Sequence, residues 1–258
     1  ISTFGASAKA KLSNPAAEGQ PEDELRAITR HVREIDRLTG DLTSLDADIA
    51  QETVDDPAVQ RLLTIAGVNA IVASGIVAAI GEISRFTEPQ KLVSYFGLNP
   101  RVRQSGLGLA QYGRISKHGR AQARGLLVEA AWAAAKAPGP LRAFFLRIRN
   151  RRGHQVAAVA TARKLVVLIW HLLTKEQDYL WLRPSLVAAK RRQLALKAGA
   201  PSEKGKGRRG SAYAYNLKEL RDQERGSSER AEKIYEHFVR QWTQRGPKRP
   251  TEVTSEER

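Results

Sequence analysis

Apolar side chains recur every three or four residues over the first part of the chain. The series runs Leu25, Ile28, Val32, Ile35, Thr39, Leu42, Asp46 and Ile49, with Leu38 and Leu45 flanking it. This spacing predicts an amphipathic helix, which we place in a helical linker over residues 22–54. A helical hairpin or coiled coil, with self-association through residues 25–49, is one interpretation. A surface helix packed on its own domain is the other.

Residues 57–182 are predicted to form a compact, mainly α domain. Asp55 and Asp56 precede Pro57, a combination that ends one helix or caps the next. Periodicity predicts helices at 59–65, 70–80, 88–96, 121–136, 139–151 and 156–173. Strand signals are few. The exception is a long, Gly-rich, basic loop over 97–119, and long loops within compact domains are usually functional.

The two ends of the chain differ in composition from the predicted domain. Residues 1–21 are rich in Ser, Ala, Gly and Pro and predict a flexible lead-in. Residues 183–258 predict a basic linker, one helix at about 216–244 and a disordered tail.

The net charge of the chain limits the kinds of partner that it is expected to bind. The 258 residues include 43 Lys and Arg against 27 Asp and Glu, a net charge of +16, which favours nucleic acid or an anionic membrane surface. The longest apolar run, 70–80, is far short of the roughly 20 residues of a spanning helix, so we expect no membrane partner. The absence of cysteine excludes disulfides and thiolate metal sites and favours a cytoplasmic location.

A tight turn, Gly67-Val68-Asn69, separates two predicted helices and resembles a helix-hairpin-helix element. Backbone N–H groups at such a turn, together with the helix dipole, favour a DNA phosphate. Asn69 stands where a second glycine is usual, and asparagine tolerates the left-handed conformation. The alternative is a buried turn in which Gly67 and Gly75 allow close packing.

The candidate serine of the basic loop is Ser105, which is followed by Gly106. Its cationic side chains, with one histidine, are Arg101, Arg103, Arg114, Lys117, His118, Arg120 and Arg124. They suit a phosphodiester backbone, because arginines make forked contacts and glycines let the backbone approach. The Ser105 hydroxyl is a candidate nucleophile if its deprotonation is assisted. The alternatives are a turn role for Ser105, and a phosphate contact for His118 in place of a base.

Further cations lie on the helices behind the loop. Arg163 and Lys164 interrupt an apolar helix, so they must be solvated, paired or bound to phosphate. Residues 144–153 carry four arginines in about two turns, which form either a basic ridge or a solvated face. The only acids between 57 and 153 are Glu82, Glu88 and Glu129, too scattered for a two-metal phosphodiester site.

The ordered motifs LLTIAGVN, ASGIVAAIGEISRFTEPQKLVSYFGLNPRVRQSG, YGRISKHGRAQARGLLVEAAWAA and ATARKLVVLIWHLL, followed by Tyr179, span residues 62–179. They closely resemble the carboxy-terminal transposase domain of the DEDD insertion-sequence transposases, the family numbered 110 together with 116 and 902. The resemblance implies a recombinase that acts on double-stranded DNA and is guided by a structured RNA encoded by the element. It also implies that Ser105, in the QSG motif, is the nucleophile and forms a transient phosphoserine link to DNA.

The family's RuvC-like domain, which holds a divalent metal such as Mg²⁺, precedes the helical linker. This chain offers only about 20 polar residues there, so we expect a fragment or truncated copy with no cofactor of its own. The alternative to a catalytic transposase is a non-catalytic, nucleic-acid-binding remnant, and a basic RNA-associated protein is a third hypothesis. The predicted DNA or RNA contacts are Gly67, Val68, Asn69, Arg101, Arg103, Gly106, Arg114, Lys117, His118, Arg120, Arg124, Arg163 and Lys164.

Overall fold

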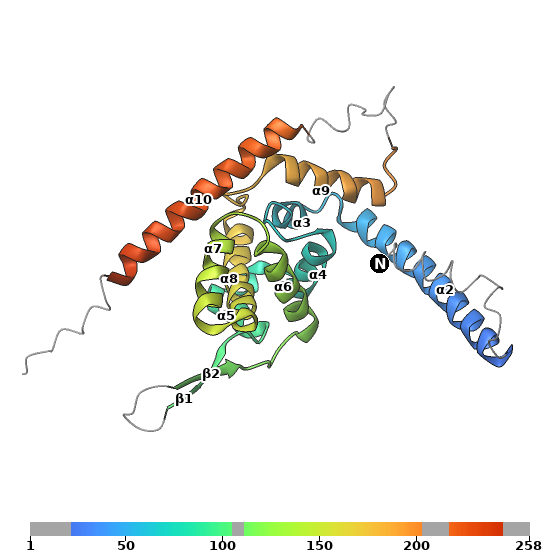
Figure 1. The fold of residues 1–258 in the computed structure, drawn as a ribbon, viewed down its shortest axis with the longest axis horizontal. Coiled ribbons are helices and arrows are strands. Elements are labelled where there is room, and N and C mark those ends of the chain that lie inside the picture. The colour runs from blue at the N-terminus through green and yellow to red at the C-terminus, as the bar shows by residue number, and fades with distance from the viewer. Residues whose placement is uncertain (1–21, 105–110, 203–216, 245–258) are drawn as a thin grey trace, which may run out of the picture.

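A computed structural model describes residues 22–104, 111–202 and 217–244 (Figure 1). The helices are α2 (Glu22–Thr53), α3 (Pro57–Leu62), α4 (Ala70–Ile80), the short 3-10 helix η1 (Ile83–Arg85), α5 (Pro89–Tyr95), α6 (Ala121–Ala134), α7 (Pro140–Arg152), α8 (His154–Lys175), α9 (Pro184–Lys197) and α10 (Lys218–Gln244). The strands β1 (Pro100–Arg103) and β2 (Gln111–Ile115) form one antiparallel pair. The predicted mainly α fold is confirmed. The predicted lead-in over 1–21 and the tail after 244 lie outside the described residues.

Helix α8 is the centre of the fold, and α5, α6 and α7 pack around it. Its Leu165, Val166 and Ile169 are fully buried. The helix is long and apolar enough to cross a membrane by length and composition, with a mean hydropathy of 1.7, and half of that window is buried inside the domain. A helix packed on several sides must be apolar around most of its circumference, so its composition follows from its central position.

The helix starts follow from their capping residues. Asp56 caps α3, since its Oδ1 accepts hydrogen bonds from the N–H of Ala58 at 2.7 Å and of Val59 at 3.3 Å. The predicted Asp-Pro cap is therefore confirmed. Asn69 caps α4 by accepting from the Val72 N–H at 2.9 Å. Its φ of −99° is extended, so the expected left-handed conformation of Asn69 is wrong.

Only the C-terminal end of α2 packs on the domain, and the rest projects away from it (Figure 1). Ala50 is buried, whereas the exposed large apolar residues of α2 are Ile35, Leu38, Leu42, Leu45 and Ile49. The spacing between these five residues alternates between three and four positions. Leu38 and Leu45 are therefore members of the apolar seam, whereas the sequence pattern places them beside it. Asp46 does not belong to it, because its carboxylate pairs with Lys197 of α9 at 2.6 Å.

A helix, α9, occupies Pro184–Lys197, where the basic composition favoured a linker. Val187 and Leu194 are buried, so one face of this basic segment packs on the protein. Lys190 Nζ donates to the carbonyls of Leu63 and Ile65, both at 2.8 Å. Burial lowers the Lys190 pKa to about 8. Packing and these two hydrogen bonds hold the segment in place, which composition alone did not indicate.

Helix α10 lies along the outer side of α7 and α9 and contacts both helices (Figure 1). The Glu224 carboxylate accepts from the N–H of Ser185 at 2.9 Å and from its hydroxyl. The Glu232 carboxylate accepts from the N–H of Gly139 at 3.1 Å and from Nε of Arg142 at 3.0 Å. A carboxylate at a helix N-terminus interacts favourably with free N–H groups and with the helix dipole. Two acids of α10, two turns apart, therefore stabilise the starts of two other helices.

Candidate nucleic-acid interface

The segment expected as a loop contains a β-hairpin that projects from the helical domain, on the side away from α9 and α10 (Figure 1). Pro100 pairs with Ile115, Val102 with Tyr112 and Arg103 with Gln111, with an irregularity between Pro100 and Val102. Short runs in which polar and apolar residues alternate are compatible with strands, and the dense glycines and arginines obscured them. Ser105 and Gly106 follow β1 in the sequence and lie outside the described residues.

The base of the hairpin is bonded to the end of α5. The Ser116 N–H donates to the Asn99 carbonyl at 2.7 Å, and the Lys117 N–H donates to that of Gly97 at 3.1 Å. Gly119 has a φ of 134°, and a Cβ there would lie 2.2 Å from the Tyr95 carbonyl oxygen. Only glycine allows this close approach. The hairpin therefore leaves the domain from a fixed base.

Two predicted phosphate ligands hold this base in place. The half-buried Arg124 donates from one guanidinium nitrogen to the carbonyls of Phe96 at 3.2 Å and Lys117 at 3.3 Å. Arg120 donates from Nε to the Tyr95 hydroxyl at 2.9 Å and lies 5.7 Å from the centre of that ring. Arg120 is exposed, so it retains a surface on which to meet an anion.

The remaining cations of the motif lie on the strands and just after them. Those with exposed side chains are Arg101, Arg103, Arg114, Lys117 and His118. Among the described residues none of these five forms an ion pair, although Arg101 donates to the Ser116 carbonyl at 3.3 Å. Lys117 has a φ of 59°, a left-handed conformation that is rare for lysine. The structure thus gathers positive charge on the hairpin and its base.

The turn at Gly67, Val68 and Asn69 has contacts of its own. Gly67 has a φ of 90°, and a Cβ there would lie 2.4 Å from the backbone nitrogen of Ala134 in α6. Val68 is fully buried, and its N–H donates to the Ile65 carbonyl at 3.2 Å. These contacts agree with close packing, the alternative weighed for this turn. Its phosphate role stays a prediction.

Arg163 and Lys164 lie on α8 and do not belong to the hairpin. Arg163 donates to the side-chain oxygen of Gln90 at 3.3 Å, and Lys164 is exposed. A neutral amide leaves the charge of Arg163 uncompensated. The described residues contain no group of three or more His, Asp or Glu side chains placed to hold a metal ion.

Tyr95, which the sequence analysis did not single out, links the hairpin base to the domain. Its hydroxyl donates to the Ala79 carbonyl at 3.1 Å while accepting from Arg120. Arg85 also lies over the ring, 5.6 Å from its centre. A tyrosine beside Phe96, at the end of a short helix that buries Leu92 and Val93, looks like an ordinary core residue, so the pattern carried no signal for this role.

The comparison with known protein families agrees with this domain. Residues 59–146 match the family described as Transposase IS116/IS110/IS902. This part of the chain is similar to that transposase family. The match spans α3 to α7, so the matched region includes both the Gly67 turn and the hairpin.

Two relatives of this chain show the extent of the likeness. A probable family 20 transposase of Pseudomonas aeruginosa is 31% identical over 150 residues, which are 57% of this chain and 44% of the relative. The transposase for insertion sequence element IS1111A of Coxiella burnetii is 35% identical over 124 residues, 46% of this chain and 34% of the relative. The aligned part of the chain is thus less than half the length of either relative.

Proposed function

We propose that this chain carries the DNA-binding and strand-transfer domain of an insertion-sequence transposase, with Ser105 as the nucleophile. The single observation that carries the proposal is the projecting hairpin, whose cations have no acidic partner among the described residues. Ser105 stands two residues after its first strand. Uncompensated cations on a projecting element suit a phosphodiester backbone, because arginine and phosphate form strong forked contacts.

The proposed step is a transesterification. The Ser105 oxygen attacks phosphorus and loses its proton to a base, for which His118 is the candidate. The new bond is a phosphoserine ester, and the bond from phosphorus to one sugar oxygen breaks. That oxygen takes up a proton as it leaves. Arg101 and Arg103 would offset the charge that develops on the phosphoryl oxygens.

The metal chemistry that the family resemblance implies does not fit the described residues. Glu82, Glu88 and Glu129 lie on separate elements and form no cluster with other acids. We therefore derive no step through a metal ion. A divalent cation belongs to the proposal only as a partner whose site lies outside the described residues. An element-encoded guide RNA belongs to it only as a partner that the family resemblance implies.

The exposed stripe on α2 fits self-association with a second copy. Its members Ile35, Leu38, Leu42, Leu45 and Ile49 have the alternating spacing of a coiled-coil seam. Each of the five is at least 39% exposed, so the stripe is not covered within the described chain. Pairing of two such helices would bring two hairpins into one assembly.

The test is Ser105→Ala in the complete transposase, assayed with a labelled, nicked DNA substrate on a denaturing gel. We expect the covalent protein–DNA adduct and strand exchange to disappear while DNA affinity is retained. Ser116→Ala is the matched control, because among the described residues Ser116 contributes only backbone bonds at the hairpin base. An adduct formed by Ser105→Ala would remove Ser105 from the mechanism. Binding without any adduct, even in the unmodified protein, would identify the non-catalytic nucleic-acid-binding alternative.

A further inference from the structure

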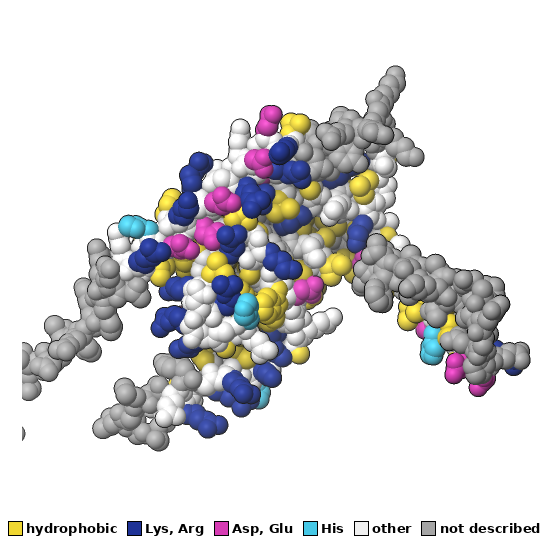
Figure 2. All heavy atoms as spheres, in the orientation of Figure 1, with side chains coloured by type: hydrophobic (Ala, Val, Ile, Leu, Met, Phe, Trp, Pro, Cys, Tyr) yellow, Lys and Arg dark blue, Asp and Glu magenta, His cyan; other side chains and the backbone are white. Residues whose placement is uncertain are grey.

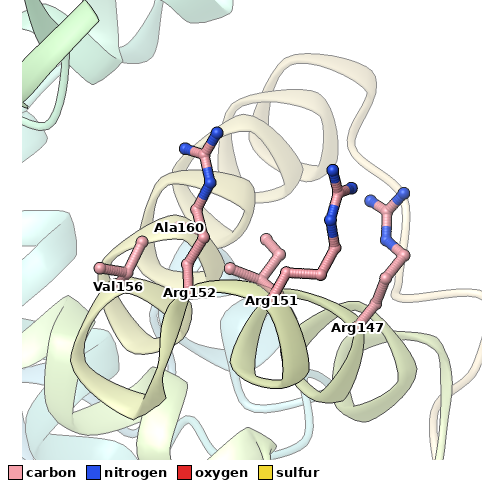
Figure 3. Close-up of a pocket in the computed structure, with 6 residues that line it drawn as sticks. Arg147, Arg151, Arg152, Val156 and Ala160 are labelled. Atoms are coloured by element: carbon pink, nitrogen blue, oxygen red, sulfur yellow. The ribbon is translucent and has the colours of Figure 1, made fainter.

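Three arginines of α7 surround a hollow between α7 and α8. Arg147, Arg151 and Arg152 line it together with Ile148, and Val156 and Ala160 line it from α8. Figure 3 shows the three guanidinium groups projecting to the same side of α7. We call this hollow the α7–α8 pocket. It lies on different elements from the hairpin.

The charge of the α7–α8 pocket is not balanced by an acidic residue in its own lining. No lining residue is acidic, and within the described chain none of the three guanidinium groups has an ion pair or a hydrogen bond. At the other end of α7, by contrast, Arg142 is paired with Glu232 at 3.0 Å. Like charges held close together repel one another, so an arrangement of this kind is most stable when an anion lies between them.

The Arg147 side chain is held in position by contacts with the rest of the domain. Its guanidinium lies 5.4 Å from the centre of the Phe144 ring. Its Nε is buried and has no hydrogen-bond partner among the described residues. A buried donor without an acceptor is costly, and such groups in folded proteins call for an explanation. One such explanation is a ligand that draws the Arg147 guanidinium into a new geometry.

The start of α8 adds a second positive feature. Among the described residues no side chain caps its N-terminus, where Gly153 has a φ of 85°. The first N–H groups of a helix and its dipole attract anions. Val156, which lines the pocket, lies in this first turn. Arg163 and Lys164 follow Ala160 by three and four residues, so they extend the positive surface along the same face of α8.

We propose that the α7–α8 pocket binds phosphate groups of a nucleic-acid backbone, as a contact additional to the hairpin. Arginine suits this ligand, because its planar fork matches phosphate oxygens and stays charged at all relevant pH values. Arg147 and Arg151 are one helical turn, about 5.4 Å, apart and so offer two contact points along one strand. Lys and Arg side chains gather along the α7 edge of the domain in Figure 2. The proposal for this pocket does not depend on a catalytic role for Ser105.

The experiment measures the salt dependence of binding for Arg151→Gln in the full chain. The probes are a labelled DNA duplex and a labelled RNA hairpin, each titrated by fluorescence anisotropy over a series of salt concentrations. Arg149→Gln is the matched control. It removes the same charge from the same helix, but Arg149 lines a neighbouring hollow toward α10 and donates to the Asn150 side chain at 3.2 Å.

We expect Arg151→Gln to reduce the log–log salt slope by about 0.9 on duplex DNA if one phosphate contact is lost. The probe on which the slope changes identifies the nucleic acid that the pocket holds. We expect Arg149→Gln to leave the slope unchanged and Arg151→Lys to restore most of it. Equal changes for Arg151→Gln and Arg149→Gln would mean diffuse attraction and would overturn the proposal. An unchanged slope on both probes would overturn it as well. Neither outcome bears on the adduct assay for Ser105.

Discussion

The side chains of Tyr95 and Arg120 join the hairpin to the helical domain. Arg120 Nε donates to the Tyr95 hydroxyl at 2.9 Å, and that hydroxyl donates onward to the Ala79 carbonyl of α4 at 3.1 Å. The Arg120 backbone N–H also donates to the Tyr95 carbonyl at 3.2 Å. A candidate phosphate ligand is thereby oriented by a residue that has no charge.

Tyr95→Phe keeps the ring and removes both side-chain hydrogen bonds. We expect unfolding free energy to fall by about 1–2 kcal/mol, as is typical for the loss of buried or partly buried hydrogen bonds. DNA affinity should fall as well, because Arg120 loses its orientation. Urea unfolding and anisotropy measure the two effects. Tyr235→Phe, whose hydroxyl has no hydrogen bond among the described residues, should change neither, and an equal loss there would contradict the role of Tyr95.

Gly67→Ala tests the packing role of the turn. The added Cβ would lie 2.4 Å from the Ala134 backbone nitrogen, and a φ of 90° is unfavourable for alanine. We expect a loss of about 2 kcal/mol or more in unfolding free energy, since backbone cannot move aside as a side chain can. Gly125→Ala, in α6 with open space around the new Cβ, should instead be neutral or stabilising by up to about 1 kcal/mol. A tolerated Gly67→Ala would count against the packing interpretation.

Glu232→Gln tests the attachment of α10. Its carboxylate is nearly buried and bonds the start of α7 through Gly139 and Arg142. We expect a loss of about 2 kcal/mol in unfolding free energy, the range for hydrogen bonds to charged groups. Earlier proteolysis within α10 should accompany it. The exposed pair of Glu229 with Arg225 provides the control, because Glu229→Gln should cost well under about 1 kcal/mol. Equal effects from both variants would argue against a specific role for Glu232.

Lys190 makes stability depend on pH. Its pKa is lowered by burial from 10.5 to about 8, so between these values the unfolded chain binds the proton and the folded chain does not. Stability from this group therefore rises with pH from about 8 toward 10.5 and is constant below 8, with a slope of up to about 1.4 kcal/mol per pH unit. Urea unfolding at several pH values should show this rise, and Lys190→Met should lack it. Parallel curves for the two proteins would contradict the pKa shift.

Leu38→Asn combined with Leu45→Asn tests the exposed seam of α2. If two copies pair through it, both substitutions place polar groups in an apolar interface, and the association constant should fall by at least about tenfold, or roughly 1.4 kcal/mol. Sedimentation equilibrium measures this directly. Ser44→Asn, on the polar side of α2, should leave the mass unchanged. A monomeric unmodified chain would contradict the proposal without affecting the hairpin.

The sequence by itself determined most of the helices, because the signals for a helix are local. A period near 3.6 residues and the cap at Asp56 are features of short stretches, and the helix over 70–80 was predicted with its observed bounds. The mainly α fold and the transposase resemblance followed from the same stretches. The concentration of positive charge in the middle of the chain could also be counted directly.

The tertiary structure alone decided what these residues contact. The hairpin within 97–119 needs pairing between segments that local composition does not reveal, and α9 is held by Lys190 through carbonyls more than a hundred residues away. The close approach of Gly67 to α6 and the link from Tyr95 to Arg120 are likewise non-local. Such contacts depend on how whole helices pack, and the free energy that selects them is shared among many residues. No single stretch of sequence therefore records them.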